Sequence, residues 1–437
     1  MSSNNWTLSV DIVESTIIKG GRILHKYTDK TSFFQGLDPF EILEQYGSPL
    51  YVYNERILRE NCAKMKNLVD YPNFKVNYSV KANSNLHLLE IIRQEGLSVD
   101  AMSPGEIFVE LAAGFSAEQI LYICNNVSSE EMRFAVEHGI LTSLDSLSQL
   151  ETFGRNFPNT DVVIRINPDV GAGHHSKVTT GGKNTKFGID NTQDKLSLAI
   201  KIANNYNLRI VGLNQHIGSL FMDGDSYLLG ARSMAEVAKQ FESLELIDLG
   251  GGFGVPYRKL SGESPLDLQD LGRRLGALMS EFANEYGSQL QFKIEPGRFV
   301  CCESGVLLGT VNSVKDCYGT KYVGTDIGFN VLARPMMYDA HHDIEVHSKN
   351  ESHQTEVVSI VGNICETGDV LAKDRELQVA KEGDILCVLD AGAYGMSMAS
   401  NYNMRLRPAE LLICEDGTQR LIRHRDTLDG LLTQFPK

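Results

Sequence analysis

Several side chains that could perform chemistry stand in, or just after, short apolar runs of this sequence. Lys81 follows the run 76–80, where a lysine either extends to solvent or acts as an amine nucleophile that forms a Schiff base. Seven later runs each contain or precede a polar residue or motif, and these are Asp100, Asn125, Asp145, Arg165, His216, the segment 250–254 and the segment 295–298. Any one of them could be accidental, but together they predict a single polar site.

The segment 250–254, with the sequence GGGFG, suits a phosphate, because glycines let backbone N–H groups approach an anion closely. It is not a P-loop, since no Gly-Lys-Ser/Thr follows, and it lacks the GxGxxG spacing of a dinucleotide site. A flexible turn is the alternative interpretation. Arg298, on the loop after the next apolar run, could supply a second phosphate contact.

The elements that must position these residues are eight apolar runs of strand character, with amphipathic stretches of helical spacing between them. The strand-like runs are 76–80, 98–102, 120–124, 141–145, 161–167, 210–217, 244–249 and 292–295, and the clearest helical stretches are 85–94, 105–113, 129–138 and 269–285. Eight such units over about 250 residues predict an α/β fold of the (β/α)8 TIM-barrel type, whereas a doubly wound open sheet would normally use fewer strands. Chemistry in such a barrel lies where strands end, which is where the polar residues fall.

A second, β-rich region begins after about residue 300, where the helical pattern fades. Its strand-like runs are 306–314, 357–361, 385–389 and 410–413. Residues 1–45 are interpreted as a short β-rich start. A chain of 437 residues is too long for one ordinary core, so one large domain with a smaller one is expected.

The composition argues against several classes of partner. A net charge of −15 disfavours nucleic acid and anionic membranes, both of which demand a basic face. No apolar run approaches the roughly 20 residues that span a bilayer, and the N-terminus lacks the features of a signal peptide. The eight cysteines show no zinc-type spacing and, Cys365 apart, are interpreted as reduced cysteines of a cytosolic protein. The adjacent His341 and His342 are interpreted as a polar loop, and no metal site is expected.

A set of motifs then identifies a resemblance. YSVKAN, HIGS, DLGGGFG, EPGR, CETGD, GAYG, SNYN and RPAE occur in that order, and RINP and TTGGKNTKFGI also match. Over residues 49–413 the chain resembles the fold-type III pyridoxal phosphate (PLP) decarboxylases, and most closely those that act on diaminopimelate. The resemblance implies a cytoplasmic enzyme that converts meso-2,6-diaminopimelate to L-lysine and CO2, the last step of lysine biosynthesis.

The resemblance also implies an architecture. The N-terminal segment 1–45 would contribute to the β-domain, residues 46–304 would form the PLP-binding barrel, and residues 305–437 would form a β-domain of the Greek-key-like barrel or sandwich type. The family further implies a head-to-tail homodimer whose active sites lie at the subunit interface.

The family pattern assigns cofactor roles to residues of this chain. Lys81 would carry PLP as a Schiff base, His216 would stack on the pyridine ring, and Glu295 would keep the ring nitrogen protonated. Asp100 and Glu106 match an acidic pair that supports the ring. The phosphate would be surrounded by Gly250, Gly251, Gly252, Ser219, Gly297, Arg298 and Tyr394.

Substrate contacts are likewise carried over from the family. They would come from Arg298, Arg334, Tyr338, Glu366 and Tyr394. Arginines suit carboxylates because a guanidinium binds one with two hydrogen bonds, and Glu366 suits a distal ammonium. Cys365 would protonate the carbon that loses CO2, and by the family pattern Cys365 and Glu366 enter the site of the other subunit.

The sequence departs from the family pattern beside the predicted substrate pocket. The segment 325–335 differs from the usual VDAGMNDLIRP, residues 339–342 replace GAYH, and Met102 replaces a valine. The alternative substrates are therefore a D-amino acid, a carboxylated polyamine or a siderophore or antibiotic precursor. Racemisation is disfavoured because Glu295 suits a protonated ring. An inactive regulatory homologue is disfavoured because Lys81, Cys365 and the phosphate loops are present.

Overall fold

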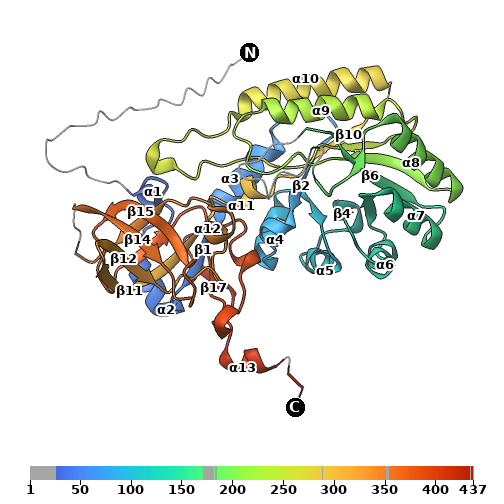
Figure 1. Ribbon diagram of the computed structural model, residues 1–437. Coiled ribbons are helices and arrows are strands. Elements are labelled where there is room, and N and C mark those ends of the chain that lie inside the picture. The colour runs from blue at the N-terminus through green and yellow to red at the C-terminus, as the bar shows by residue number, and fades with distance from the viewer. Residues whose placement is uncertain are drawn as a thin grey trace.

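Figure 1 shows the chain as a computed structural model in which a parallel barrel lies beside a second, β-rich unit. The structure describes residues 26–170, 182, 185–287, 289–350, 354–433 and 435–436. The first 25 residues and part of the motif at 179–189 lie outside the described residues. Within the described part of the chain, no helix is both long and apolar enough to cross a membrane.

The barrel is a closed ring of parallel strands, as the sequence predicts. The strand order is β5-β4-β3-β2-β10-β9-β8-β6, and pairing between β5 and β6 closes the ring. Its strands are β2 (Phe74–Ser79), β3 (Ser98–Ala101), β4 (Ile120–Cys124), β5 (Leu141–Leu144), β6 (Asp161–Asn167), β8 (Arg209–Asn214), β9 (Leu246–Asp248) and β10 (Gln291–Ile294). The short β7 (Ile189–Asp190) pairs only with β6.

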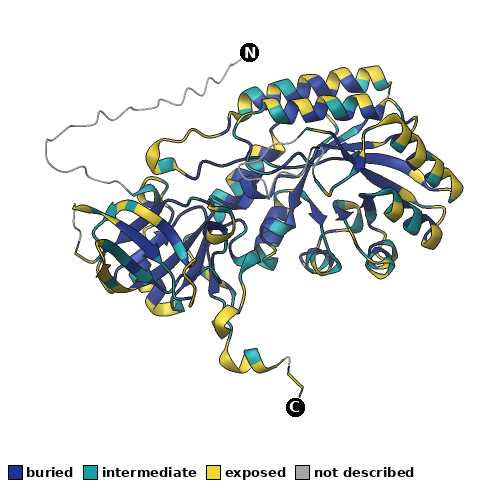
Figure 2. Cartoon of the chain, in the orientation of Figure 1, coloured by how far each residue is buried: buried dark blue, intermediate teal, exposed yellow. Residues whose placement is uncertain are grey.

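Helices cover the outside of the barrel, with their inner faces buried and their outer faces exposed (Figure 2). They are α4 (Leu86–Gln94), α5 (Pro104–Ala112), α6 (Ser129–Glu137), α7 (Leu147–Asn156), α8 (Gln193–Asn205), α9 (Asp225–Ala238) and α10 (Leu268–Tyr286). The short α11 (Arg298–Cys301) is buried over its whole length. Serines set several starting points: Ser103, Ser128 and Ser146 each accept a hydrogen bond from a backbone N–H three residues further on. Such caps satisfy donors that the first helical turn leaves free.

The barrel interior has an apolar part that is separate from the main core. Leu121 and Ile123 of β4 pack with Val163 and Leu246, whereas Tyr122 of β4 belongs to the main core between strands and helices. Successive side chains of a strand point to opposite faces, so the first group fills the inside of the ring.

The second unit is a mixed sheet with the order β15-β14-β12-β11-β1-β17-β18, to which β16 and β13 add through β11. The strands are β1 (Leu50–Asn54), β11 (Gly305–Cys317), β12 (Thr320–Thr325), β13 (Ile344–His347), β14 (Thr355–Val361), β15 (Val370–Gln378), β16 (Ile385–Val388), β17 (Ala409–Ile413) and β18 (Gln419–Arg423). Because β1 pairs with β11 and β17, the predicted barrel segment 46–304 begins with a strand of the other sheet.

The prediction of a β-rich start is wrong for its described part, residues 26–45. This part forms α1 (Tyr27–Lys30) and the beginning of α2 (Pro39–Tyr46). The Asp38 side chain accepts a hydrogen bond from the Phe40 N–H and Pro39 stands at the first helical position, which together favour a helix start. Ile42 of α2 then packs against Leu50 of β1, so this segment belongs to the core of the β-domain.

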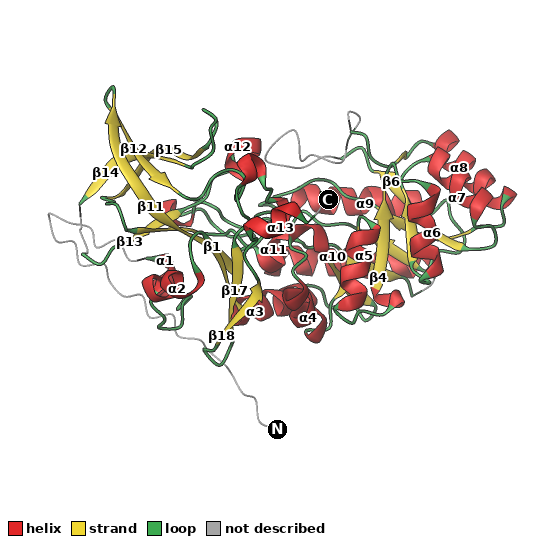
Figure 3. Ribbon diagram, turned by 90° about the horizontal axis from the view of Figure 1, so that it is seen from below, coloured by secondary structure: helices red, strands yellow, loops and turns green. Residues whose placement is uncertain are grey.

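Three further helices complete the chain: α3 (Glu55–Lys66), α12 (Arg334–Tyr338) and α13 (Leu428–Leu432). In the view from below, α3 and α11 lie between the β-domain strands and the barrel (Figure 3). The Asn61 side chain of α3 donates a hydrogen bond of 3.4 Å to the Val300 carbonyl of α11.

Candidate active site

Lys81 lies in a one-turn 3-10 helix (Val80–Ala82) directly after β2. The preceding Ser79 hydroxyl is 3.2 Å from Asp100 Oδ2 and 3.1 Å from the Glu295 carbonyl, which ties the ends of three barrel strands together. Burial lowers the pKa of the Lys81 amine, but nearby negative groups, led by Asp100, outweigh it and raise this pKa overall. Without a bound partner the amine is therefore held as an ammonium among carboxylates.

Three buried carboxyl groups, Asp100, Asp248 and Glu295, meet below this lysine. Burial raises the pKa of Asp100 to about 7. Burial and the mutual repulsion of the carboxylates raise the pKa of Glu295 well above its usual range. Asn214 Nδ2 donates to Glu295 at 3.3 Å, and the Gly250 N–H donates to Asp248 at 2.9 Å. A cationic N–H placed against Glu295 would relieve this repulsion.

Arg165 of β6 is a buried cation whose charge interacts with this cluster. Burial lowers the pKa of its guanidinium, while Glu295 and Asp145 oppose that effect. Its Cζ lies 4.6 Å from the centre of the Phe187 ring. The predicted strand-end residues Asp145 and Arg165 thus belong to the same electrostatic network.

His216 follows β8 by two residues and is a neutral imidazole. The Gly251 N–H donates to His216 Nδ1 at 3.0 Å, so Nδ1 accepts and the ring proton is on Nε2. Burial, reinforced by Lys81 and Arg165, lowers the pKa of His216 well below its usual value. The predicted strand extends to residue 217, but β8 ends at Asn214 and the chain turns into the mouth of the barrel.

The glycine segment owes its composition to the close approach of neighbouring loops. A Cβ on Gly250 would lie 2.1 Å from the Gln215 carbonyl oxygen, and one on Gly251 would lie 2.0 Å from that of Glu295. Gly252 has a φ of +111°, which side-chain-bearing residues rarely adopt. Only glycine lets these backbones converge, and the same feature opens the segment to an anion.

Arg298 contacts both the loops of the barrel mouth and the second domain. Its Nη2 donates to Ser219 at 2.9 Å and its Nη1 donates to the Tyr257 hydroxyl at 2.7 Å, while its buried Nε has no partner among the described residues. The ring of Tyr394, a residue of the second domain, lies 4.8 Å from Arg298 Cζ. The Tyr394 N–H donates to the carbonyl of Ala82, next to Lys81, at 2.8 Å.

Gly297 and Glu106 complete the set of predicted cofactor residues. A Cβ on Gly297 would meet the Ser79 Cβ at 2.9 Å, so glycine allows the strand ends of β2 and β10 to pack closely. Glu106, on α5, accepts a hydrogen bond of 2.6 Å from the Met102 N–H. Burial raises the pKa of Glu106, and its charge contributes to the raised pKa of Asp100.

Arg334, like Arg298, has a buried guanidinium group near the ring of Tyr257. Its Nη1 lies 2.7 Å from His342 Nε2, and since arginine only donates, Nε2 must accept. His342 Nδ1–H therefore donates to the Leu389 carbonyl at 2.8 Å. Arg334 Cζ also lies 4.4 Å from the centre of Tyr257, so this one ring contacts both arginines.

His341 and His342 lie in a loop before β13, as the sequence predicts, but His342 is 1% exposed, and its contact with Arg334 was missed. Tyr257 is also a site residue that sequence reasoning missed. Its position in the loop after the seventh barrel strand is the signal that could have indicated it. No local pattern could have indicated His342, because its partner Arg334 is brought to it by the packing of α12.

The remaining predicted residues lie in the second domain and are less buried. Tyr338 ends α12 and is half-buried, whereas Cys365 and Glu366 are exposed in the loop between β14 and β15. The Cys365 N–H donates to Asn403 Oδ1 at 3.2 Å, and the Tyr402 hydroxyl donates to the Glu366 carboxylate. Both partners belong to a loop of the same domain.

One group among the described residues has ligand atoms close enough for a metal ion. Glu345, His347 and Cys387 have such atoms within 4.8 Å of one another, on β13 and β16 of the second sheet. The Glu345 carboxylate already accepts hydrogen bonds from the backbone N–H of Tyr27 and from the Thr28 hydroxyl at 2.6 Å. These hydrogen bonds from α1 to Glu345 fix the start of that helix.

The barrel mouth fits pyridoxal phosphate. It offers a primary amine, a carboxylate cluster that a protonated ring nitrogen would relieve, and a glycine segment beside a buried arginine. Asp100 Oδ1, Asp248 Oδ2 and Arg298 Nε are buried without a partner among the described residues, which is the expected state of groups that bind a ligand.

Comparisons with known proteins agree with this geometry. The family described as "Pyridoxal-dependent decarboxylase, pyridoxal binding domain" matches residues 55–302. The chain is 38% identical to the diaminopimelate decarboxylase of Methanothermobacter thermautotrophicus, with 91% of this chain and 94% of that protein covered. It is 34% identical to that of Bacillus subtilis, with 91% and 93% covered.

Solved structures of similar proteins include two that contain L-lysine. Diaminopimelate decarboxylase from Helicobacter pylori in complex with L-lysine superposes with a TM-score of 0.83 at 30% identity, covering 90% of this chain and 98% of that one. The M. jannaschii enzyme in co-complex with L-lysine gives a TM-score of 0.84 at 33% identity, with 92% and 95% covered.

Proposed function

This chain belongs to the pyridoxal-dependent decarboxylase family, and from that premise we propose that it removes CO2 from meso-2,6-diaminopimelate and releases L-lysine. The observation that carries the proposal is the pair of buried guanidiniums, Arg298 and Arg334, on one tyrosine beside the lysine-bearing mouth of the barrel. Such a pair suits a substrate that keeps one carboxylate while it loses another. A cytoplasmic location fits this biosynthetic role.

The barrel mouth would bind the cofactor. Pyridoxal phosphate, when bound, supplies an electron sink for the bond to the departing carboxylate. Lys81 would hold it covalently, Glu295 would keep a proton at the ring nitrogen, and neutral His216 would lie against the ring. The phosphate would be bound by Gly250, Gly251, Gly252, Ser219, Gly297, Arg298 and Tyr394.

The second domain would bind the substrate. Arg298 and Arg334 would hold the carboxylate that is kept, with Tyr338 and Tyr394 at their sides, and Glu366 would bind the distal ammonium. Cys365 would donate a proton to the carbon that loses CO2. Buried cysteines suit this task less, because burial raises the pKa of thiols such as Cys124 and Cys301 to about 12.

Two copies of the chain would share their sites. The support is the exposure of Cys365 and Glu366, whose chemistry needs a buried partner surface. Apolar side chains on neighbouring elements are exposed as well: Met336 by 46%, Tyr402 by 43% and Met404 by 56%. Clustered exposed apolar residues are typical of protein interfaces.

The first test is a visible absorption spectrum of the purified protein, followed by detection of lysine and CO2 after addition of meso-diaminopimelate. We expect a cofactor band that Lys81→Ala abolishes, together with lysine release. A band without lysine release would contradict the proposed substrate and point to another amino acid, such as a D-amino acid or a carboxylated polyamine. No band after addition of pyridoxal phosphate would contradict the proposed cofactor.

The shared site is tested by mixing two inactive variants, Lys81→Ala and Cys365→Ala, under conditions that exchange subunits. If the sites are shared, each mixed dimer has one site with both residues intact, so activity should return to about a quarter of the wild-type value. A mixture that exchanges subunits and stays inactive would contradict the sharing. Refolding each variant alone is the control.

A further inference from the structure

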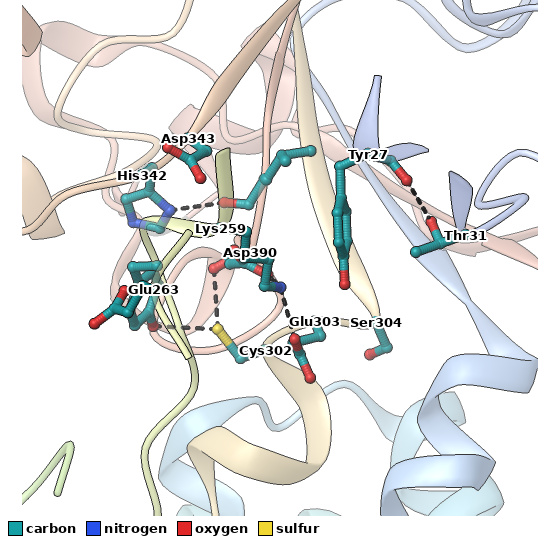
Figure 4. A network of polar contacts seen from close by, with 12 residues as sticks. Tyr27, Thr31, Lys259, Glu263, Cys302, Glu303, Ser304, His342, Asp343 and Asp390 are labelled. Carbon is teal, nitrogen blue, oxygen red and sulfur yellow. Dashed lines mark hydrogen bonds and ion pairs between the residues drawn. The ribbon is translucent and has the colours of Figure 1, made fainter. Parts of the chain in front are cut away.

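Lys259 lies outside the barrel mouth in a buried junction of charged and aromatic groups (Figure 4). Its Nζ is 2.6 Å from a carboxylate oxygen of Asp390 and 2.6 Å from one of Glu303. The same Nζ is 4.7 Å from the centre of the Tyr27 ring. Burial lowers the pKa of Lys259, but the two carboxylates outweigh it, so the pKa is raised overall and the side chain stays charged.

The junction joins parts of the chain that are far apart in sequence. Lys259 stands in the loop between β9 and α10, Glu303 follows α11, Asp390 follows β16, and Tyr27 begins α1. The Lys259 side chain is 7% exposed and that of Asp390 is 3% exposed. An ion pair so well shielded from water is costly to break, because the remaining partner is left charged and buried.

Two branches lead from the junction to the arginines, one through Tyr257 and one through the segment 389–394, and each branch reaches both. Tyr257, two residues before Lys259, accepts the hydrogen bond from Arg298 and contacts Arg334 through its ring. The Cys302 thiol lies 3.1 Å from the Tyr257 hydroxyl and 3.1 Å from the Asp390 carbonyl, which connects the two branches.

The other branch runs through the residue before Asp390. The carbonyl of Leu389 holds His342, which in turn accepts from Arg334. The segment that follows Asp390 leads to Tyr394, whose ring lies against Arg298. Fixing Lys259 and Asp390 therefore fixes the surroundings of both guanidiniums.

The two arginines need such a scaffold because they repel each other. Both face Tyr257, and the charge of Arg298 contributes to a lowered pKa of Arg334, for which burial is the main cause. Like charges in a poorly hydrated site move apart unless neighbouring groups hold them. A displacement of about 1 Å can cost on the order of 100-fold in a bound state that depends on aligned groups.

We propose that Lys259 is a positioning residue: its bonds to Asp390 and Glu303 hold Tyr257 and the segment 389–394 so that Arg298 and Arg334 receive the carboxylate that the substrate keeps. This rests on the proposed function, because it assigns that carboxylate to the arginine pair. A merely structural ion pair would stabilise the fold without favouring a ligand that carries this carboxylate.

The test compares two ligands of the cofactor-loaded protein. L-Lysine carries the carboxylate that the arginines would bind, and cadaverine is the same diamine without it. We expect Lys259→Met to weaken binding of L-lysine on the order of 10- to 100-fold, and to change cadaverine binding less than about twofold. Lys259→Arg, which keeps the charge, should restore most of the affinity. Lys239→Met removes an exposed lysine paired with Glu236 and Glu285 and serves as the matched control.

A second variant separates misfolding from a loss of positioning, because Lys259→Met alone leaves the Asp390 carboxylate buried and unpaired. The double variant Lys259→Met/Asp390→Asn removes both charges, and we expect it to fold and still to lose L-lysine selectively. Equal weakening of both ligands, or wild-type L-lysine binding in the folded double variant, would overturn the inference. Failure of the proposed function shows itself differently: the wild-type protein would then bind cadaverine but not L-lysine, which would overturn both.

Discussion

The mouth of the barrel and the Cys365–Glu366 loop both carry residues of the proposed reaction, but they are built in opposite ways. Asp100 and Glu295 are buried at the ends of rigid strands, and their neighbours in the same chain already surround them. Cys365 and Glu366 are exposed, and their contacts outside their own loop include hydrogen bonds with Asn403 and Tyr402 of the same domain. This exposure is the observation that supports the proposed sharing of the site between two copies of the chain.

The barrel mouth and the Cys365–Glu366 loop also differ in their electrostatics. The barrel mouth concentrates carboxylates whose pKa values burial raises, so it is poised to accept a cationic ligand. The exposed carboxylate of the loop, Glu366, accepts a hydrogen bond from the Tyr402 hydroxyl at the surface. Substitutions in the barrel mouth should therefore alter the cofactor and its electronics, whereas substitutions in the loop should alter turnover or substrate binding and leave the cofactor unchanged.

The largest expected effect comes from Glu295→Gln in the barrel mouth. The amide cannot hold a proton on the ring nitrogen, so the rate of decarboxylation should fall on the order of 1000-fold. Cofactor should remain bound through Lys81 with a changed absorption spectrum. Turnover within tenfold of the wild-type value would show that Glu295 does not set the ring charge.

Cys365→Ala tests the loop and should have the next largest effect. Loss of a proton donor should lower kcat on the order of 100-fold, with an unchanged cofactor spectrum. Cys317→Ala is the matched control, because Cys317 is the other exposed cysteine among the described residues. If both variants keep full activity, the contrast between the two regions has no catalytic meaning.

Arg334→Lys probes the place where the two regions meet. Lysine keeps the charge but lacks the planar fork that contacts Tyr257 and donates to His342, so KM for diaminopimelate should rise about tenfold or more, with a smaller change in kcat. The measurement is steady-state kinetics of the two proteins side by side. An unchanged KM would remove Arg334 from carboxylate binding.

The sequence predicts the barrel well because the signals for its strands are local. Runs such as 120–124 and 161–167 coincide with β4 and β6, since continuous apolar residues between turns are typical of buried parallel strands. The predicted strand 210–217 extends beyond the end of β8, and this difference has a local cause too. Gly218 has a φ of +140°, and the chain leaves the sheet before it. Because barrel strands end at one face, the order of polar residues along the chain was enough to predict that they share one mouth, whereas their cofactor roles come from the family resemblance and stay predictions.

The substrate half depends on contacts between distant segments, and local patterns do not carry them. The sequence predicts that β1 begins the barrel segment, yet its partners in the structure are β11 and β17. His342 reads as part of a polar loop, yet the burial of Arg334 makes it a hydrogen-bond acceptor in the core. The roles of Tyr257 and Lys259 arise only where the loop after β9 meets the second domain.

A buried carboxyl group on α5 extends the comparison of the two regions to the stability of the protein. Glu110 is 0% exposed, and neither of its carboxylate oxygens has a partner among the described residues. Burial, with smaller contributions from Asp100 and Glu106, raises its pKa from 4.5 to about 9. The buried carboxyl of Glu110 thus differs from that of Asp369 in the loop, which accepts hydrogen bonds from the backbone N–H groups of Phe329 and Ile364.

Glu110→Gln should have the smallest effect on activity, less than about twofold, but a clear effect on stability. The folded protein keeps a proton on Glu110 that the unfolded chain releases, so the free energy of unfolding should fall with rising pH, by at most about 1.4 kcal/mol per pH unit, between about pH 4.5 and about pH 9. The variant lacks this dependence, so its gain in unfolding temperature should be larger at about pH 8 than at about pH 5. Exposed Glu118→Gln is the control, and parallel pH profiles for wild type and Glu110→Gln would show that Glu110 is ionised in the folded protein.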